Sequence, residues 1–214
     1  NIWFATGDGL TKVNAIERYK KQPKFKTYKK DTKDQGALSH NYILSLYQST
    51  EGELWVGTFG GGLNKYIPGK DGEEGSFISY SGRDGLPNNV IKGILEDSQG
   101  NLWLSTNMGL SKFNPKNETF KNYNESDGLQ DNEFQELARL KRKNGKLIFG
   151  GTNGFNVFNP AEIKDNPFEA ETIITGFSVF NKPVNVGDTL NNRVLLKHPI
   201  NLVHPKINKY DNYL

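Results

Sequence analysis

The chain has 214 residues, a formal net charge of +3 and no cysteine. A chain of this length can bury one large core or two small ones, and the lack of cysteine excludes disulfide bonds and thiolate metal sites. Its charges are spread evenly, with no basic run interleaved with stacking aromatics, so the sequence gives no argument for direct contact with nucleic acid.

The N-terminal run from Asn1 to Ala5 has the apolar character of a strand and lacks the pattern of a signal peptide. A mature protein normally does not start inside a strand, so we expect this chain to be a segment of a longer protein. Its first unit would then lack a preceding strand and expose Ile2, Trp3 and Phe4. No stretch reaches the roughly 18 apolar residues that a membrane-spanning helix needs.

Four similar segments follow one another along the chain, at intervals of about 50 residues, the period of propeller blades. Their anchor residues are Trp3, Trp55, Trp103 and Ile148. Further apolar runs precede the second, third and fourth anchors, and others follow the first, second and third. All of them are bounded by Gly, Asn, Asp or Pro. These runs are Leu38–Tyr47, Leu86–Leu95, Leu129–Ala138, Phe25–Tyr28, Phe77–Tyr80 and Phe120–Tyr123. Each unit therefore offers four short strands and no helical periodicity of useful length.

A four-stranded unit cannot bury both of its faces alone, so the units must pack on one another. Four strands per period favour a β-propeller over a linear solenoid. We therefore predict an all-β fold, with about four propeller blades over residues 1–160 and the first blade incomplete. The repeated tryptophans are expected to fill the space between neighbouring blades.

In such a propeller, the loops between blades and the loops that follow the tryptophan strands lie on the same side. Carboxylates, amides and aromatics on that side suit a hydroxyl-rich or anionic ligand. The same residue types also stabilise turns, and for any single residue that is the simpler interpretation. The candidate ligand-binding residues are His40, Asn41, Phe59, Arg83, Asp84, Asn88, Asn107, Asp131 and Asn132.

Known catalytic patterns are missing from the sequence. His40, His198 and His204 do not have the spacing of metal ligands, and there is no nucleophile elbow, phosphate loop or pair of catalytic carboxylates. We therefore predict no catalytic residue, no metal site and no cofactor in this segment.

The runs Leu86–Phe113 and Leu38–Leu63 resemble the two-component regulator propeller repeat. Both have an acidic residue and a glycine before a Leu-Trp pair, then a threonine and a Gly-Leu pair. Downstream, Phe158–Ile163 and Ile173–Asn181 resemble the passage from the last blade into the Y_Y_Y domain, an immunoglobulin-like module, and Lys206–Leu214 resembles its next strand. The resemblance implies a linker and the start of that domain over residues 161–214, with Pro160 and Pro167 stiffening the joint.

In that family, propellers and a Y_Y_Y domain form the periplasmic sensor of a hybrid two-component histidine kinase of the inner membrane. The resemblance implies that this segment detects an oligosaccharide or another small polar ligand and itself performs no phosphotransfer. Its other partners would be the remaining blades and the Y_Y_Y domain, with a homodimer in the full sensor and a transmembrane helix outside this segment. The alternative is a propeller-type glycan-binding protein or glycan-active enzyme that uses the same repeats.

Overall fold

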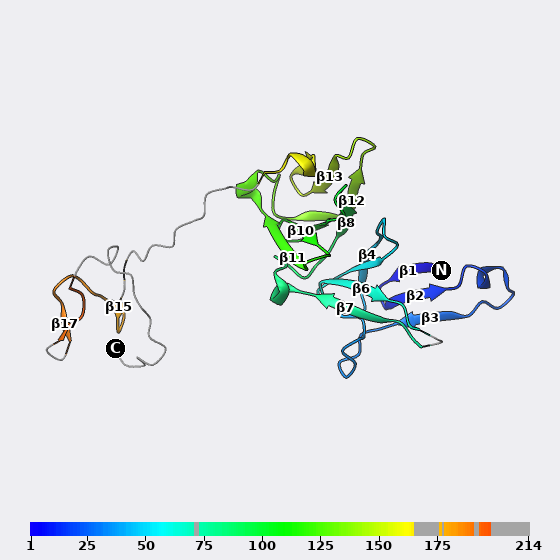
Figure 1. The fold of residues 1–214 in the computed structure, drawn as a ribbon, viewed down its shortest axis with the longest axis horizontal. Coiled ribbons are helices and arrows are strands. Elements are labelled where there is room, and N and C mark those ends of the chain that lie inside the picture. The colour runs from blue at the N-terminus through cyan, green and yellow to red at the C-terminus, as the bar shows by residue number, and fades with distance from the viewer. Residues whose placement is uncertain (71–72, 165–175, 177, 191–192, 198–214) are drawn as a thin grey trace. The chain divides into compact units, whose positions relative to one another are not determined.

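A computed structural model describes residues 1–70, 73–164, 176, 178–190 and 193–197 (Figure 1). The chain divides into two compact units, Asn1–Ile163 and Lys164–Leu214. The first unit consists of successive antiparallel sheets whose strands follow one another in chain order, as in a propeller blade. The all-β fold predicted from the sequence is therefore confirmed.

We number the sheets of the first unit as blades 1 to 4. Blade 1 contains β1 (Ile2–Thr6), β2 (Gly9–Val13) and β3 (Phe25–Tyr28). Blade 2 contains β4 (Ile43–Gln48), β5 (Leu54–Thr58), β6 (Leu63–Ile67) and β7 (Ser76–Tyr80). Blade 3 contains β8 (Gly93–Glu96), β9 (Leu102–Ser105), β10 (Leu110–Asn114) and β11 (Thr119–Tyr123). Blade 4 contains β12 (Phe134–Lys141), β13 (Leu147–Gly151) and β14 (Gly154–Phe158).

Short 3-10 turns complete the first unit: η1 (Glu17–Tyr19), η2 (Gly82–Asp84), η3 (Glu125–Asp127) and η4 (Pro160–Glu162). Both η2 and η3 begin with a capping box and end at a glycine with positive φ. These two turns occupy the same place in the loops that enter blades 3 and 4, and they hold the two loops in one conformation.

Three hydrophobic clusters fill the spaces between successive blades. In each space, the tryptophan of one blade contacts an aromatic ring on the third strand of the next. The ring centroids are 4.7 Å apart for Trp3 and Tyr66, 5.6 Å for Trp55 and Phe113, and 4.8 Å for Trp103 and Phe158. The tryptophans therefore pack between blades, as the sequence predicted.

Each tryptophan is also covered by a lysine from the neighbouring strand of its own sheet. Lys12, Lys65 and Lys112 pair in register with Trp3, Trp55 and Trp103, and their Nζ atoms lie 5.4, 5.4 and 6.0 Å from the ring centroids. Such contacts combine apolar cover from the lysine stem with attraction of the ammonium to the ring. In blade 4, Ile148 pairs with Val157 instead.

The two end blades each expose one apolar face. Phe4 and Phe25 are exposed on blade 1, and Phe155 and Leu140 on blade 4, with 67% of Phe155 accessible. Trp3 was expected on the open flank together with Ile2 and Phe4, but it points the other way and packs against blade 2. The alternation of side chains along a strand is the reason, because neighbours of an outward residue must face inward.

The second unit begins at Lys164, close to the predicted boundary at residue 161. Its described strands form two short hairpins: β15 (Ser178–Val179) with β16 (Lys182–Pro183), and β17 (Thr189–Leu190) with β18 (Arg193–Val194). Phe158 and Ile163, at the start of the predicted joint, still pack in the blade 3–4 cluster. Pro167 and residues 206–214 lie outside the described residues, and the Y_Y_Y domain stays a prediction.

None of the helices among the described residues has the length and apolar character required to cross a membrane.

Candidate ligand-binding face

The loops that enter a blade contact the loop after the tryptophan strand of the preceding blade. Backbone N–H groups of Gly9, Gly62 and Gly109 donate to the carbonyl oxygens of Asn41, Asn89 and Asn132, at 2.7, 2.9 and 2.6 Å. These repeated bonds place both sets of loops side by side on one face of the propeller, which we call the loop face. The face predicted from strand order therefore exists.

The side chains of the same three asparagines fix the loops that carry them. Their Oδ1 atoms accept the backbone N–H of Lys30, Gly82 and Glu125, at 2.7, 2.8 and 3.0 Å respectively. Asn41 and Asn132 were candidates for ligand binding, and the structure gives both of them a role in loop conformation. Residues of this type often serve in this way, because a short amide can replace a backbone acceptor.

Threonines hold the loops that follow the tryptophan strands. Oγ1 of Thr6, Thr58 and Thr106 donates to the carbonyl oxygen of Gly9, Gly62 and Gly109, at 2.7, 2.9 and 2.9 Å. Each of these glycines has a positive φ, a region that other residues rarely adopt. Hydrogen bonds between side chains and the backbone therefore hold the loops of the loop face in place.

Three further candidates use at least one polar atom inside their own loop. Nδ1 of His40 accepts the backbone N–H of Tyr42 at 3.1 Å, and Oδ1 of Asn88 accepts that of Val90 at 2.8 Å. Asp84 closes the η2 capping box, since its Oδ2 accepts the backbone N–H of Ser81 at 2.7 Å. Beside it, Arg83 is exposed and takes part in none of the ion pairs found among the described residues.

Asp131 lies between two loops of blade 4. Its Oδ1 accepts the backbone N–H of Asn132 at 2.6 Å, and its Oδ2 accepts the Thr152 hydroxyl at 3.0 Å. These bonds stabilise the carboxylate and lower the pKa of Asp131 from its ordinary value, with the Asn132 bond as the larger cause. Asp131 therefore remains charged at the edge of the loop face.

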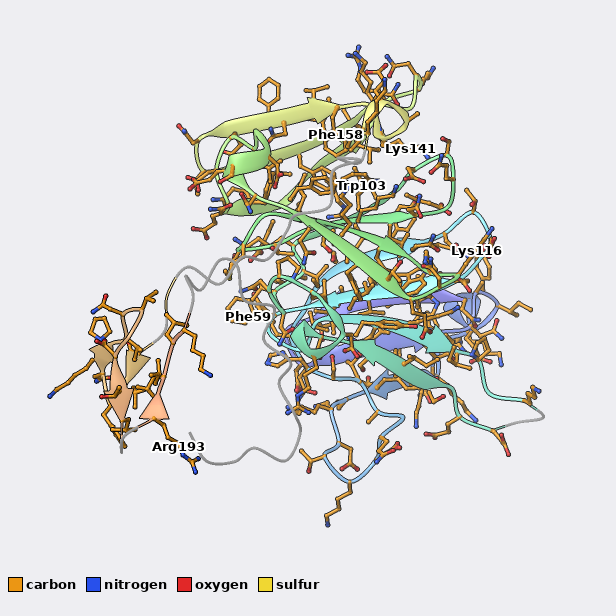
Figure 2. All side chains as sticks on the ribbon, turned by 60° about the vertical axis from the view of Figure 1, so that its left-hand side comes forward. Phe59, Trp103, Lys116, Lys141, Phe158 and Arg193 are labelled. Atoms are coloured by element: carbon orange, nitrogen blue, oxygen red, sulfur yellow. The ribbon has the colours of Figure 1, made fainter. Side chains whose placement is uncertain are left out.

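An exposed aromatic pair lies at the centre of the blade 2 loops. Phe59, labelled in Figure 2, is 47% exposed, and Tyr42 is 44% exposed. Their ring centroids are 5.7 Å apart in an edge-to-face arrangement. The backbone holds the two residues together, because Phe59 N–H donates to the Tyr42 carbonyl at 2.9 Å. The two exposed rings offer an apolar surface for a ligand.

The equivalent loop of blade 3 presents a different pair of groups. Met108 is 57% exposed, and Oδ1 of the adjacent Asn107 is buried and has no hydrogen-bond partner among the described residues. A buried acceptor without a partner is uncommon and costs free energy. Asn107 is the one sequence candidate whose polar atom is both enclosed and unused.

The nine candidates thus fall into local groups. Asn41 lies where blade 1 meets blade 2, and His40 lies in the same entry loop beside Gly61. Phe59 and Asn88 lie where blade 2 meets blade 3, while Asn107, Asp131 and Asn132 lie where blade 3 meets blade 4. Arg83 and Asp84 lie on the η2 turn, which is tied to Asn89. The sequence analysis missed Tyr42. The signal was an aromatic residue directly after His40 and Asn41 in an otherwise polar loop.

In the part of the chain that the structure describes, no group of three or more His, Asp or Glu side chains is placed to hold a metal ion.

Two stretches of the chain, residues 37–60 and 85–108, match the family model of the two component regulator propeller. The chain carries two-component regulator propeller repeats. These matched stretches contain the entry loop, first strand and tryptophan strand of blades 2 and 3. They include Tyr42 and five of the nine candidates: His40, Asn41, Phe59, Asn88 and Asn107.

Proteins similar to this chain are larger than it. Histidine kinase P4 of Formosa agariphila is 30% identical over 186 residues, which are 87% of this chain and 13% of that protein. PorZ, a bacterial surface component of the type-IX secretion system of Porphyromonas gingivalis, is 15% identical with a TM-score of 0.56, over 72% of this chain and 22% of PorZ. The latter likeness concerns the fold alone.

A third similar protein is the extracellular domain of a putative hybrid two component system from B. thetaiotaomicron. It is 26% identical with a TM-score of 0.43, over 74% of this chain and 26% of that domain. The present chain therefore spans less than a third of the length of each of these relatives.

Proposed function

We propose that this chain is part of the extracytoplasmic, ligand-sensing region of a hybrid two-component histidine kinase, and that its loop face binds an oligosaccharide. The propeller repeats and the sequence similarity to a histidine kinase over most of the chain support the first part. The exposed Tyr42–Phe59 pair supports the second and is the observation on which the ligand class depends.

The chemistry of that pair fits a sugar ring better than a simple ion. One face of a pyranose presents C–H groups that pack on an aromatic surface, while its hydroxyls need donors and acceptors nearby. The carboxylate of Asp131 provides an acceptor in the loop that enters blade 4. An exposed Arg83 adds a cation at the outer part of the face, which suits an anionic sugar.

In this proposal the segment performs no catalysis and lies in the periplasm as part of an inner-membrane protein. The ligand signal passes from the propeller through a Y_Y_Y domain to a transmembrane helix and kinase outside the chain, in a homodimeric sensor. Ligand binding shifts such an equilibrium only through contacts that differ between two states. A glycan-binding protein or a glycan-active enzyme with the same repeats is the alternative, and hydrolysis of a bound glycan by this chain would favour the enzyme.

A panel of soluble neutral and acidic oligosaccharides tests the proposal through the melting temperature of the chain. We expect one chemical class to raise it by a few degrees at millimolar concentration, because a ligand that binds only the folded state stabilises it. Phe59→Ala should abolish this rise, while Phe25→Ala, on the open face of blade 1, should preserve it. If no sugar changes the melting temperature, or if Phe59→Ala responds like the unmodified chain, the proposal is wrong.

A further inference from the structure

Arg139 occupies a position that is apolar in the neighbouring blades. It pairs in register with Phe149, the residue after the blade 4 anchor, and Leu46 and Ile94 pair in the same way with the residue after the tryptophan in blades 2 and 3. Ile94 is fully buried between blades 2 and 3, and Leu46 packs between blades 1 and 2. Blade 4 therefore places a guanidinium where the other blades have a hydrocarbon side chain.

Strand β12 is bulged just before Arg139. The backbone N–H groups of Phe134 and Ile91 donate in the same way to the preceding blade, at 3.1 and 3.0 Å. Arg139 lies five positions after Phe134, whereas Ile94 lies only three after Ile91. In the bulge, Leu137 has a φ of +59° and is 73% exposed. A bulge redirects the side chains of its strand, and strained backbone of this kind is common at functional sites.

The facing strand of blade 3 leaves room for the Arg139 side chain. A Cβ on Gly93 would lie 2.9 Å from Cδ of Arg139, so the arginine stem packs directly on this glycine. Ser45 stands at the same position in blade 2. The first strands β4, β8 and β12 contact one another, so Arg139 lies where the first strands of blades 3 and 4 meet. Two neighbouring blades of the chain enclose it.

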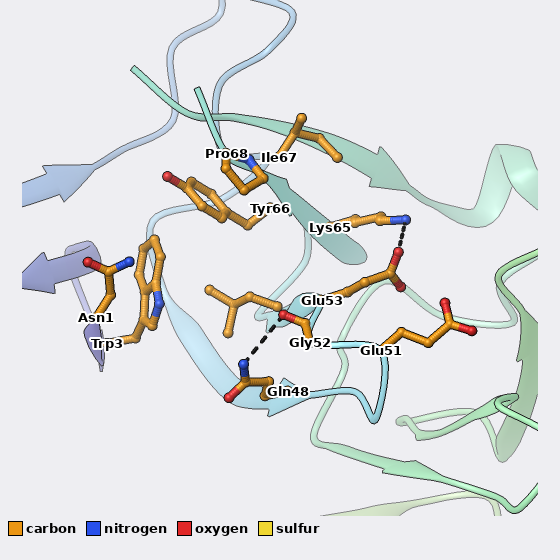
Figure 3. Close-up of a pocket in the computed structure, with 11 residues that line it drawn as sticks. Asn1, Trp3, Gln48, Glu51, Gly52, Glu53, Lys65, Tyr66, Ile67 and Pro68 are labelled. Atoms are coloured by element: carbon orange, nitrogen blue, oxygen red, sulfur yellow. Dashed lines mark hydrogen bonds and ion pairs between the residues drawn. The ribbon is translucent and has the colours of Figure 1, made fainter. Parts of the chain in front are cut away.

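Arg139 has no ion-pair partner in the part of the chain that the structure describes. Other partly buried cations have one: Figure 3 shows Lys65 beside Glu53, and Nζ of Lys92 lies 3.2 Å from the Glu133 carboxylate. Nη1 of Arg139 is buried and makes no hydrogen bond to the described residues. Burial lowers the pKa of Arg139 from its ordinary value, and a buried charge without a partner costs free energy that an anion would recover.

We propose that Arg139 binds the carboxylate of a small ligand, either a free organic acid or an acidic sugar, between the first strands of blades 3 and 4. A guanidinium presents its N–H groups in a planar fork that matches the two oxygens of a carboxylate. The exposed Leu137 in the adjoining bulge offers an apolar contact to the rest of the ligand. This site is separate from the Tyr42–Phe59 pair, so the two proposals can fail independently.

The melting temperature of the full 214-residue chain tests this in sodium acetate, sodium glucuronate and glucose, at constant ionic strength with sodium chloride as the reference. Glucuronate should raise it by about 3 degrees at roughly tenfold above its dissociation constant, and glucose should not. An equal rise with acetate identifies a free organic acid as sufficient, whereas a rise with glucuronate alone identifies an acidic sugar. Phe59→Ala should keep the response, which separates this site from the loop face.

Arg139→Leu should abolish the response. Without ligand this variant should melt at a higher temperature than the unmodified chain, because it restores the apolar side chain found at Ile94 and removes an unpaired charge. Arg139→Lys keeps the charge but not the fork, and should weaken carboxylate binding roughly tenfold. Arg142→Leu removes the same charge from an exposed position of blade 4 and is the matched control, with an unchanged response.

Three results would overturn the proposal. The first is no rise in melting temperature with either carboxylate. The second is an equal rise in Arg139→Leu, which would show binding of an adventitious ion only. The third is a clear fall in the melting temperature of Arg139→Leu without ligand, which would show that a group of the protein already satisfies the guanidinium.

Discussion

The indole nitrogen of Trp103 donates a hydrogen bond to Oδ2 of Asp97 at 3.0 Å. The other oxygen of Asp97 accepts the backbone N–H groups of Gln99 and Asn101, at 2.9 and 3.0 Å. One buried carboxylate therefore joins the tryptophan that packs between blades to the tight turn before its strand. In blade 3, the acidic residue and the tryptophan therefore form one contact that fixes the turn against the blade interface.

The same position in blade 2 lacks the carboxylate. Ser49 stands where Asp97 stands in blade 3, and Nε1 of Trp55 is buried without a hydrogen-bond partner among the described residues. Ser49→Asp should supply the missing acceptor and raise the free energy of unfolding by about 1 kcal/mol. Urea unfolding measures the change. In a Trp55→Phe background, which has no indole N–H, the gain should disappear; an equal gain there would contradict this explanation.

Glu96 should contribute strongly to the contact between blades 2 and 3. Glu96→Leu leaves the Thr50 N–H without its acceptor in a buried place, so we expect a loss of about 2 kcal/mol in urea unfolding. Gln48→Leu, at the equivalent position of the preceding blade, is the matched control and should change stability little. Equal losses in both variants would contradict the assignment of this contact.

Gly109 and Gly154 separate two causes of glycine preference. Both have positive φ, but a Cβ on Gly109 would lie 2.0 Å from the Tyr123 carbonyl oxygen, whereas a Cβ on Gly154 meets nothing within 4 Å. Gly154→Ala should therefore cost only the backbone strain, about 1–2 kcal/mol. Gly109→Ala should cost clearly more, because β11 must move. The melting temperatures of the two variants measure this difference. Equal decreases in melting temperature would show that contact with the neighbouring strand does not contribute.

Alkaline pH should weaken the contact between blades 2 and 3. Burial, helped by the hydrogen bond from its hydroxyl to Glu118 at 2.7 Å, raises the pKa of Tyr80 above its ordinary value near 10. The folded state keeps this proton longer than the unfolded state, so the stabilisation is complete below about pH 10 and is lost as pH rises above it. Tyr80→Phe should flatten that part of the stability curve. An equally steep loss in the variant would assign the effect elsewhere.

Much of the propeller could be predicted from the sequence because its determinants are local and repeated. Trp55 and Trp103 lie in short apolar runs between turn residues, and that pattern predicts short strands with the tryptophans packed between blades. The open flank was predicted only in part, since the placement of Trp3 depends on which face of β1 meets blade 2.

The candidate site was harder to predict because its residues act through distant partners. The Oδ1 atoms of Asn41 and Asn132 accept hydrogen bonds from their own loops, and their carbonyl oxygens accept hydrogen bonds from the preceding blade. No local sequence pattern reveals these partners. Tyr42 becomes important only because the loop after β5 brings Phe59 to it. The sequence therefore predicted which loops form the loop face, but not which side chains on it lack hydrogen bonds within the loops.

Autophosphorylation of the full-length protein in membrane vesicles tests the central claim most directly. The oligosaccharide that stabilises the isolated chain should change the rate of phosphorylation in the unmodified protein, but not in Phe59→Ala at equal protein amount. That result would assign ligand sensing to the loop face. A ligand response that survives intact in Phe59→Ala would contradict the account.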